Sequence, residues 1–341
     1  MAWRLEAPED FRVDEIALYP TSGEGEHTFV QVEKRLRTTE QVARDLARAA
    51  GARPRDVGYA GRKDRVAVAT QWFSVPGLDP ARALALEIPG AVVRAAARHR
   101  HKLRTGQLRG NRFRVALRGV AGAEFERAAV RLDELLRCGM PNRFGGQRFG
   151  PGGDNAERGR ALLAGRGGPR DRRQARFLVS ALQARVFNAV LESRPLPPWQ
   201  LERGDLAVVH ESGGLFVVEE PGAEAERALA FEISPTGPIF GTKVAAPAWA
   251  VAARERALLA AHGIGDPLRP PRGLRLRGAR RALRARPREA RMERDGDVVR
   301  LAFSLPAGSY ATVLLEELFG APASDDTVAA TGVCSAGRQE V

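Results

Sequence analysis

Residues 59–72 (YAGRKDRVAVATQW) place a short charged segment between two runs of extended character. Residues 57–60 and 67–75 are rich in β-branched and aromatic residues, a composition that predicts two strands. The segment GRKDR at 61–65 is then a tight loop between them. Side chains in such loops face solvent or a ligand, so any chemistry in this part of the chain is expected at 61–65.

Asp64 is the carboxylate with the most informative neighbours in that loop. Arg62, Lys63 and Arg65 flank it. Positive charges on neighbouring residues favour an ionised carboxylate, lower its pKa and attract a phosphodiester. An aspartate among basic residues is more often a surface salt bridge. This pattern alone therefore leaves a catalytic carboxylate and a simple ion pair both open.

The chain on both sides of the loop alternates between strand and helix patterns. Residues 26–34 predict a strand, and the capping box of Thr38 and Gln41 then opens a helix with Val42, Leu46 and Ala49 on its apolar face and Gly51 as its cap. By the same criteria we expect strands at 111–118, 206–210, 215–220 and 298–305, and helices at 124–137, 177–193, 247–262 and 310–319.

Composition and length exclude several classes of protein. The 341 residues are 44% hydrophobic and 28% charged, as in globular proteins. There is no run of about 18 apolar residues and no secretory leader pattern, so we expect a soluble, cytoplasmic chain. Cys138 and Cys334 are too few for a disulfide framework or a structural zinc site.

The positive charge is concentrated in three segments. Residues 88–119, 137–176 and 269–300 together hold 31 basic and seven acidic residues, whereas the whole chain has 54 basic and 41 acidic residues. The rest of the chain is therefore net acidic. One basic run is usually a solvated face, but three runs in an otherwise acidic chain favour a polyanionic partner that binds through its phosphates.

Two other motifs argue against common cofactors. The Gly-rich segment 144–153 (FGGQRFGPGG) lacks the Gly-Lys-Ser/Thr ending of a triphosphate loop. His99 and His101 do not have the spacing of a zinc hydrolase and lie in a basic run, so we interpret them as RNA-facing or plain surface residues. No metal and no nucleotide cofactor are expected.

Seven segments in chain order carry a family resemblance: PEDFRVDEI at 8–16, GEGEHTFVQVEK at 23–34, YAGRKDRVAVATQW at 59–72, RHRHKLRTGQLRGNRF at 98–113, PNRFGGQRFGPGGDN at 141–155, FLVSALQARVFNAVL at 177–191 and LPAGSYATVLLEEL at 305–318. They resemble the motifs of the TruD-type tRNA pseudouridine synthases. AGRKD and PNRFGGQRFG are specific to that family.

The resemblance implies a role for particular residues. Asp64 matches the family's catalytic aspartate in GxKD. The residues that would surround the target uridine are Phe11, Lys63, Asn142, Phe144 and Tyr310. Many members have Phe at the position of Tyr310 and a basic residue at the position of Leu5. For the RNA backbone we expect contacts from Arg62, Arg100, Lys102 and Arg104.

The fold that the resemblance implies is α+β: a catalytic domain with a central mixed, mostly antiparallel sheet flanked by helices, plus an inserted α/β domain. Changes in composition near 168 and 280 place the catalytic domain at 1–168 and 281–341 and the inserted domain at 169–280. The inserted domain would bind RNA without supplying chemistry.

The implied activity is isomerisation of uridine to pseudouridine, at uridine 13 in the D arm of tRNA, by a monomer without metal or cofactor. Asp64 would attack C1′ or remove the 2′ hydrogen, and the sequence leaves both roles open. Two alternatives remain at this point: a non-catalytic RNA-binding protein, and an enzyme acting on another tRNA position or on mRNA.

Overall fold

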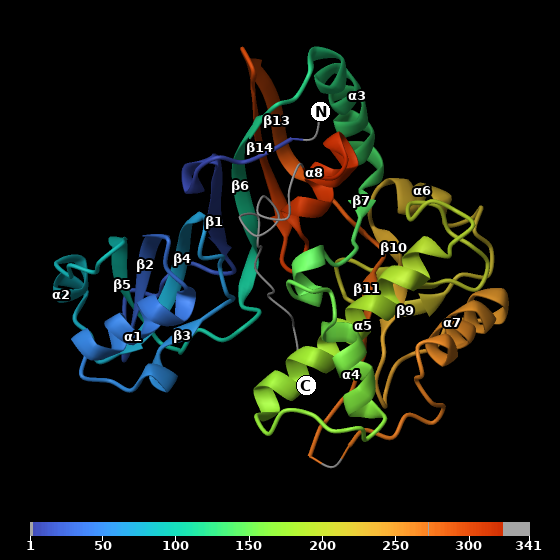
Figure 1. Ribbon diagram of the computed structural model, residues 1–341, viewed down its shortest axis with the longest axis horizontal. Coiled ribbons are helices and arrows are strands. Elements are labelled where there is room, and N and C mark those ends of the chain that lie inside the picture. Colours follow the sequence, from blue (N-terminus) through green and yellow to red (C-terminus); the bar gives the residue numbers. More distant parts are fainter. Residues whose placement is uncertain (1–2, 272, 323–341) are drawn as a thin grey trace. The chain divides into compact units, whose positions relative to one another are not determined.

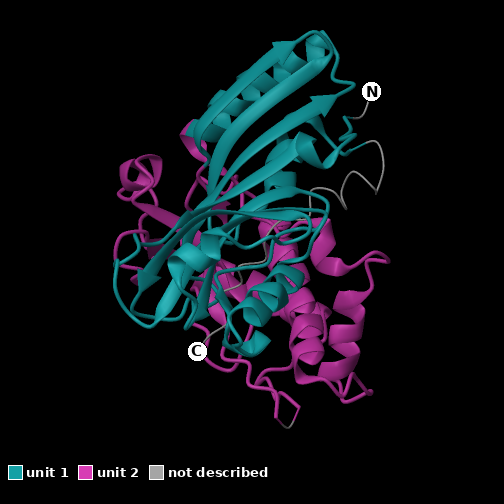
Figure 2. Cartoon of the chain, turned by 90° about the vertical axis from the view of Figure 1, so that its left-hand side faces the viewer, with its two compact units in different colours: residues 1–136, 287–340 teal, residues 137–286, 341 magenta. Residues whose placement is uncertain are grey.

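The computed structural model describes residues 3–271 and 273–322, which form two compact units (Figure 2). Unit 1 is formed by the described residues up to Leu136 and from Pro287 onward, and unit 2 by Arg137–Arg286. Unit 2 is thus an insertion in unit 1. Among the described residues, no helix has the length and apolar character needed to span a bilayer.

Unit 1 is built on one eight-stranded sheet with the order β13-β14-β6-β1-β4-β2-β5, and β3 pairs with β4 (Figure 1). Among the described residues, β1 and β4 pair in parallel, and the other ladders of this sheet are antiparallel. The strands are β1 (Phe11–Ala17), β2 (His27–Arg35), β3 (Gly58–Tyr59), β4 (Val68–Pro76), β5 (Ala91–His99), β6 (Leu108–Arg118), β13 (Arg288–Asp295) and β14 (Val298–Pro306). The predicted mixed, mostly antiparallel sheet is confirmed.

The helices of this unit are α1 (Thr39–Ala49), α2 (Pro80–Leu84), α3 (Gly122–Cys138, which runs into unit 2) and α8 (Ala311–Phe319). The capping box predicted for α1 is present: the Thr38 side chain accepts from the Gln41 amide, and the Gln41 side chain accepts from the Thr38 amide. Gly51 follows the helix with φ of 64°, a left-handed conformation that glycine adopts without strain.

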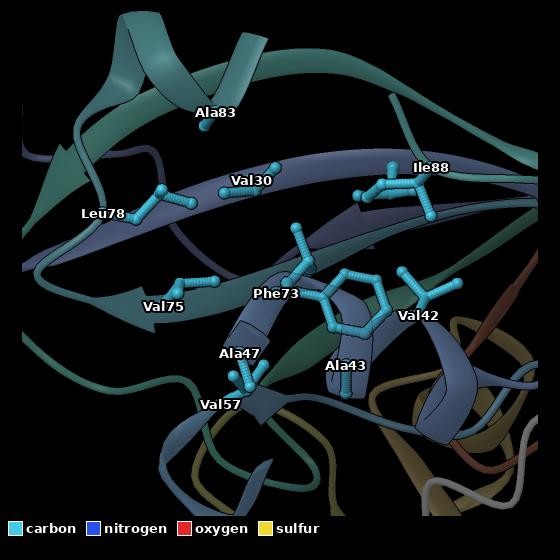
Figure 3. Packing of buried hydrophobic residues seen from close by; sticks show 12 residues of the cluster. Val30, Val42, Ala43, Ala47, Val57, Phe73, Val75, Leu78, Ala83 and Ile88 are labelled. Carbon is cyan, nitrogen blue, oxygen red and sulfur yellow. The ribbon is translucent and has the colours of Figure 1, made fainter. Parts of the chain in front are cut away.

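A buried apolar cluster joins α1 to the sheet (Figure 3). Val42, Ala43 and Ala47 of α1 lie close to Phe73 of β4, and Val30 of β2 is among the fully buried members. The apolar face of α1 differs slightly from the prediction, because Ala43 and Ala47 are buried while Ala49 is only partly covered. This core fixes the ends of β3 and β4, which the charged loop connects.

Unit 2 contains a four-stranded antiparallel sheet with the order β11-β10-β8-β9 and a two-stranded ladder of β7 and β12. Its strands are β7 (Met140–Pro141), β8 (Leu206–Val209), β9 (Leu215–Val217), β10 (Ile233–Ile239), β11 (Ala279–Ala282) and β12 (Arg284–Ala285). Its helices are α4 (Asn155–Leu163), α5 (Arg172–Glu192), α6 (Ala225–Leu229) and α7 (Trp249–Ala261).

The units divide at 136/137 and 286/287, whereas the changes in composition lie near 168 and 280. The β7–β12 ladder brings residues 140–141 beside 284–285, and α4 packs on α5. The Gly- and Arg-rich segment near 168 is therefore a connection between two packed helices. The proposed insertion at 169–280 lies within unit 2, and the part of 281–341 beyond residue 322 lies outside the described residues.

Candidate active site

The loop at 61–65 is fixed by buried polar side chains of unit 1. The Lys63 amide donates to Thr39 Oγ1 at 2.9 Å, and Thr39 Oγ1 donates to Gln71 Oε1 at 2.8 Å. Gln71 Nε2 in turn donates to the Gly61 carbonyl at 3.1 Å. Thr39 and Gln71 are both 0% exposed. The connection between β3 and β4, predicted as a loop, is thus held at Gly61 and Lys63 by side chains of α1 and β4.

Lys63 forms a buried ion pair with Glu15 of β1. The Nζ–Oε2 distance is 2.8 Å, and the two side chains are 0% and 1% exposed. Glu15 Oε1 also accepts from the Trp72 amide at 3.3 Å. Removing two charges from water costs free energy, and a buried ion pair offsets this cost only where further hydrogen bonds satisfy its polar atoms. The Lys63 ammonium therefore ties the loop to the parallel β1–β4 pair at the centre of the sheet.

Asp64 is half-buried, and its Oδ1 accepts from the Val66 amide at 3.0 Å. This hydrogen bond to the amide two residues later closes a local turn, which sets the direction of the carboxylate. The Asp64 carbonyl accepts from Nζ of Lys34, a β2 residue that is only 1% exposed. Lys34 was not among the residues predicted to act on Asp64, which were the flanking Arg62, Lys63 and Arg65.

The pKa of Lys34 is lowered to about 8, chiefly by burial and to a smaller extent by Lys63, against the Asp64 and Glu40 carboxylates, which raise it. The ammonium form therefore destabilises the fold below pH 8 relative to an uncharged side chain. Between about pH 8 and 10.5 the unfolded chain holds the proton that the folded chain has lost, so stability increases with pH in that window.

We expect the Lys34→Met variant to expose this dependence. The free energy of unfolding of the wild type should rise relative to that of the variant by about 3 kcal/mol from pH 7 to pH 10.5. Urea unfolding of both proteins at several pH values measures the difference between them. A difference that does not vary with pH would show that Lys34 does not titrate in this range.

Arg62 is exposed, and its Nε lies 2.5 Å from Glu40 Oε1. The three residues expected to contact the RNA backbone after β5 also belong to unit 1. Arg100 pairs with Glu24, Lys102 Nζ donates to the Arg55 carbonyl at 2.7 Å, and Arg104 is exposed. To bind an anion, Arg62, Arg100 and Lys102 would have to release or share their present partners.

His99, interpreted from the sequence as RNA-facing or surface, is 7% exposed. Its ring stacks on Tyr19 at 5.3 Å and lies 4.2 Å from the Phe29 ring, and its Nδ1 accepts from the Ser22 amide at 3.1 Å. The surface interpretation of His99 was wrong because β5 pairs with β2 and carries this ring into an aromatic cluster. His101 is exposed.

Phe11 and Tyr310 lie in the core of unit 1, with 1% and 2% of their surfaces exposed. Phe11 is the first residue of β1, and its ring centroid lies 6.0 Å from that of Phe113. Tyr310 is the N-cap residue of α8. Leu5 lies before β1 and is partly buried.

Asn142 of unit 2 follows β7 and is 8% exposed. Its amide donates to the Leu283 carbonyl at 2.8 Å, and its Nδ2 donates to the Ala282 carbonyl at 2.9 Å. Nη2 of Arg281 donates to Asn142 Oδ1 at 2.6 Å and also to its carbonyl at 3.1 Å. These contacts assign the orientation of the side-chain amide.

Phe144 is held beside Asn142 by α5. Its amide donates to Asn188 Oδ1 at 2.8 Å, and its carbonyl accepts from Asn188 Nδ2 at 2.9 Å. The Arg281 guanidinium lies 4.3 Å from the Phe144 ring centroid, and the Phe187 ring meets it edge-on at 5.5 Å. Arg281 therefore orients two of the five residues that the family resemblance places around the uridine, although it was not among the predicted residues.

Comparison with known proteins gives a consistent result. The family model described as tRNA pseudouridine synthase D (TruD) matches residues 5–166 and 170–318. A curated tRNA pseudouridine synthase D of Geobacter metallireducens is 40% identical, with 92% of this chain and 93% of that protein covered. Proteins of the same name from Anaeromyxobacter dehalogenans (strain 2CP-1) and Thermus thermophilus are 44% and 41% identical, covering 92% and 93% of this chain and 91% and 88% of theirs.

A solved structure described as tRNA pseudouridine synthase D from Methanosarcina mazei superimposes with a TM-score of 0.74. It covers 94% of this chain and 94% of its own, at 21% sequence identity. At that identity the likeness concerns the fold alone. It extends over both units, so the insertion of unit 2 is also part of the shared architecture.

Proposed function

The chain belongs to the tRNA pseudouridine synthase D family and is an isomerase; from this premise we propose that it converts uridine 13 in the D arm of tRNA to pseudouridine, with Asp64 as the catalytic carboxylate. The observation that carries the proposal is the loop at 61–65. A half-buried aspartate lies there between buried polar contacts to α1, β1, β2 and β4.

The reaction breaks the bond from C1′ to N1, turns the uracil, and forms a bond from C1′ to C5. The C5 hydrogen then leaves as a proton and N1 gains a proton, so the product is an isomer of the substrate. It consumes no oxidant and no second substrate. The base must leave the helical stack before C1′ can be reached. Asp64 acts at the ribose, either by attacking C1′ or by removing the 2′ hydrogen. The contacts that fix its turn preorganise the carboxylate for either role.

Aromatic rings and an amide are suited to hold an unstacked uracil. The Phe144 ring, which is partly exposed, would stack on the base, and Asn142 would bind a polar edge of the base or ribose. Phe11, Lys63 and Tyr310 belong to the same proposed set, and because all three are buried, contact with the uridine requires that the side chains covering them move. The basic residues Arg62, Arg100, Lys102 and Arg104 are proposed to bind RNA phosphates, and the first three would exchange their present partners for them.

Two experiments test this function, one on cellular tRNA and one with the purified protein. Total tRNA from cells with and without the gene is mapped for pseudouridine, and the purified protein is incubated with a tRNA transcript and with the same transcript carrying cytidine at position 13. We expect position 13 to lose its modification without the gene and the uridine transcript alone to be converted in vitro. Conversion at a different position, or none, would contradict the proposed target.

A further inference from the structure

Arg148 of unit 2 lies against two phenylalanine rings rather than against a carboxylate. It lies in the short 3₁₀ helix Gly146–Phe149, within the Gly-rich motif that the proposed function leaves without a role. The guanidinium carbon is 5.8 Å from the ring centroids of both Phe144 and Phe177. Its Nε is buried without a hydrogen-bond partner, and no acidic residue in the described part of the chain pairs with it.

Other buried arginines of unit 2 show what a structural role requires. Arg194, whose Nε also has no hydrogen-bond partner, forms two bonds to Asp205 through Nη1 and Nη2, and Arg280 forms two bonds to Glu255. A guanidinium has five N–H donors, and leaving a buried donor unsatisfied costs about 1–3 kcal/mol. A cation–π contact returns only about 0.5–1 kcal/mol where it is partly exposed. The position of Arg148 is thus poorly explained by stability alone.

Phe177 supplies the second observation. It lies near the start of α5 and is 39% exposed, whereas Leu178, Val179 and Leu182 of the same helix are 2%, 0% and 1% exposed. An aromatic ring left in solvent beside an arginine is a surface on which a nucleobase can stack. The guanidinium fork next to it matches two oxygens of a phosphate.

The backbone beside Arg148 is also open. Gly146 does not have positive φ, and a Cβ added to it would meet no atom within 4 Å. Neither backbone conformation nor packing within the protein therefore requires glycine there. Glycine there leaves the backbone open to close approach by another molecule.

We propose that Arg148 and Phe177 form a subsite for a nucleotide that flanks the target uridine, in which Arg148 binds its phosphate and Phe177 stacks on its base. The inference rests on the proposed function, because Arg148 also contacts the Phe144 ring that is assigned to the uridine. The subsite would make the enzyme bind a segment of unstacked RNA longer than the single reacting nucleotide.

The first experiment measures the dissociation constant of a D-arm stem-loop RNA by fluorescence anisotropy. We expect Arg148→Ala to raise it at least about tenfold, which corresponds to about 1.4 kcal/mol. Arg148→Lys, which keeps the charge and loses the fork, should give an intermediate value. The matched control is Arg256→Ala, which removes an exposed arginine of α7 outside the basic segments. Equal dissociation constants for the alanine variant and the control would refute the phosphate contact.

The second experiment assigns the stacked base. Phe177→Leu keeps an apolar side chain and loses the ring, so the fold is retained; circular dichroism and thermal unfolding check this. The variant should weaken binding of the intact stem-loop but not of a stem-loop with an abasic nucleotide next to the target. An equal effect on both RNAs would overturn the stacking role. Wild-type pseudouridine formation, measured in parallel, separates this failure from failure of the proposed function.

Discussion

Replacement of Asp64 by Asn should lower the rate of pseudouridine formation at least about 1,000-fold, equivalent to about 4 kcal/mol of activation free energy. An amide can neither attack C1′ nor remove a proton. The substitution is nearly isosteric, and its Oδ1 can still accept from the Val66 amide. The contact from Lys34 goes to the Asp64 backbone carbonyl, so the substitution leaves that acceptor in place.

Binding of RNA by the Asp64→Asn variant should be as strong as that of the wild type or stronger, because a negative charge is removed from a site that receives phosphates. Single-turnover assays with saturating enzyme measure the rate, and anisotropy measures the affinity. Asp133→Asn, on the exposed face of α3, is the matched control. Turnover of the Asp64 variant within about tenfold of wild type would remove the residue from its proposed role.

Local sequence patterns predicted the elements that carry the loop because their determinants lie within a few residues of each other. The Thr38–Gln41 capping box, the apolar face of α1 and the strand patterns of β2 and β4 are of this kind. The start of α5 was placed too late. The segment 172–176 is rich in arginine and follows glycines, but Asp171 caps it and it forms the first turns of the helix.

The residues that support Asp64 and Asn142 could not be predicted in the same way. Lys34 is 30 residues from Asp64 in the chain and reaches it because β2 pairs with β4. Arg281 is 139 residues from Asn142 and reaches it because β12 pairs with β7. The charge of a residue did not identify these two contacts, because the sequence has 54 lysines and arginines. Strand register determines which of them reach Asp64 and Asn142.

Glu15 is a charged residue that interrupts the strand pattern of β1 and so makes this strand hard to predict from the sequence. Residues 11–17 place Phe11, Val13 and Glu15 on one side of β1, and all three are buried. A carboxylate at the third inward position breaks the apolar alternation that identifies a strand from sequence. It is tolerated there because Lys63 neutralises it. The irregular pattern of β1 is therefore a consequence of the loop that carries Asp64.

Breaking this pair should have the largest effect on stability. Lys63→Met leaves the Glu15 carboxylate buried without its ammonium, and Glu15→Gln leaves Lys63 without its carboxylate. Each change should lower the free energy of unfolding by about 3–5 kcal/mol. Chemical denaturation at pH 7 measures it. The matched control is Arg94→Met, which breaks the exposed ion pair between Arg94 and Glu33 and should cost no more than about 1 kcal/mol.

The double variant Glu15→Gln/Lys63→Met separates two effects of the ion pair: neutralisation of one buried charge by the other, and anchoring of the loop to β1. If its main effect on stability is neutralisation of one buried charge by the other, the double variant should be more stable than the Lys63→Met single variant, because no charge is left uncompensated. Its pseudouridine formation should nevertheless stay low, since the loop has lost its ionic anchor to β1. Strictly additive losses of stability in the double variant would contradict the coupling that the 2.8 Å contact implies.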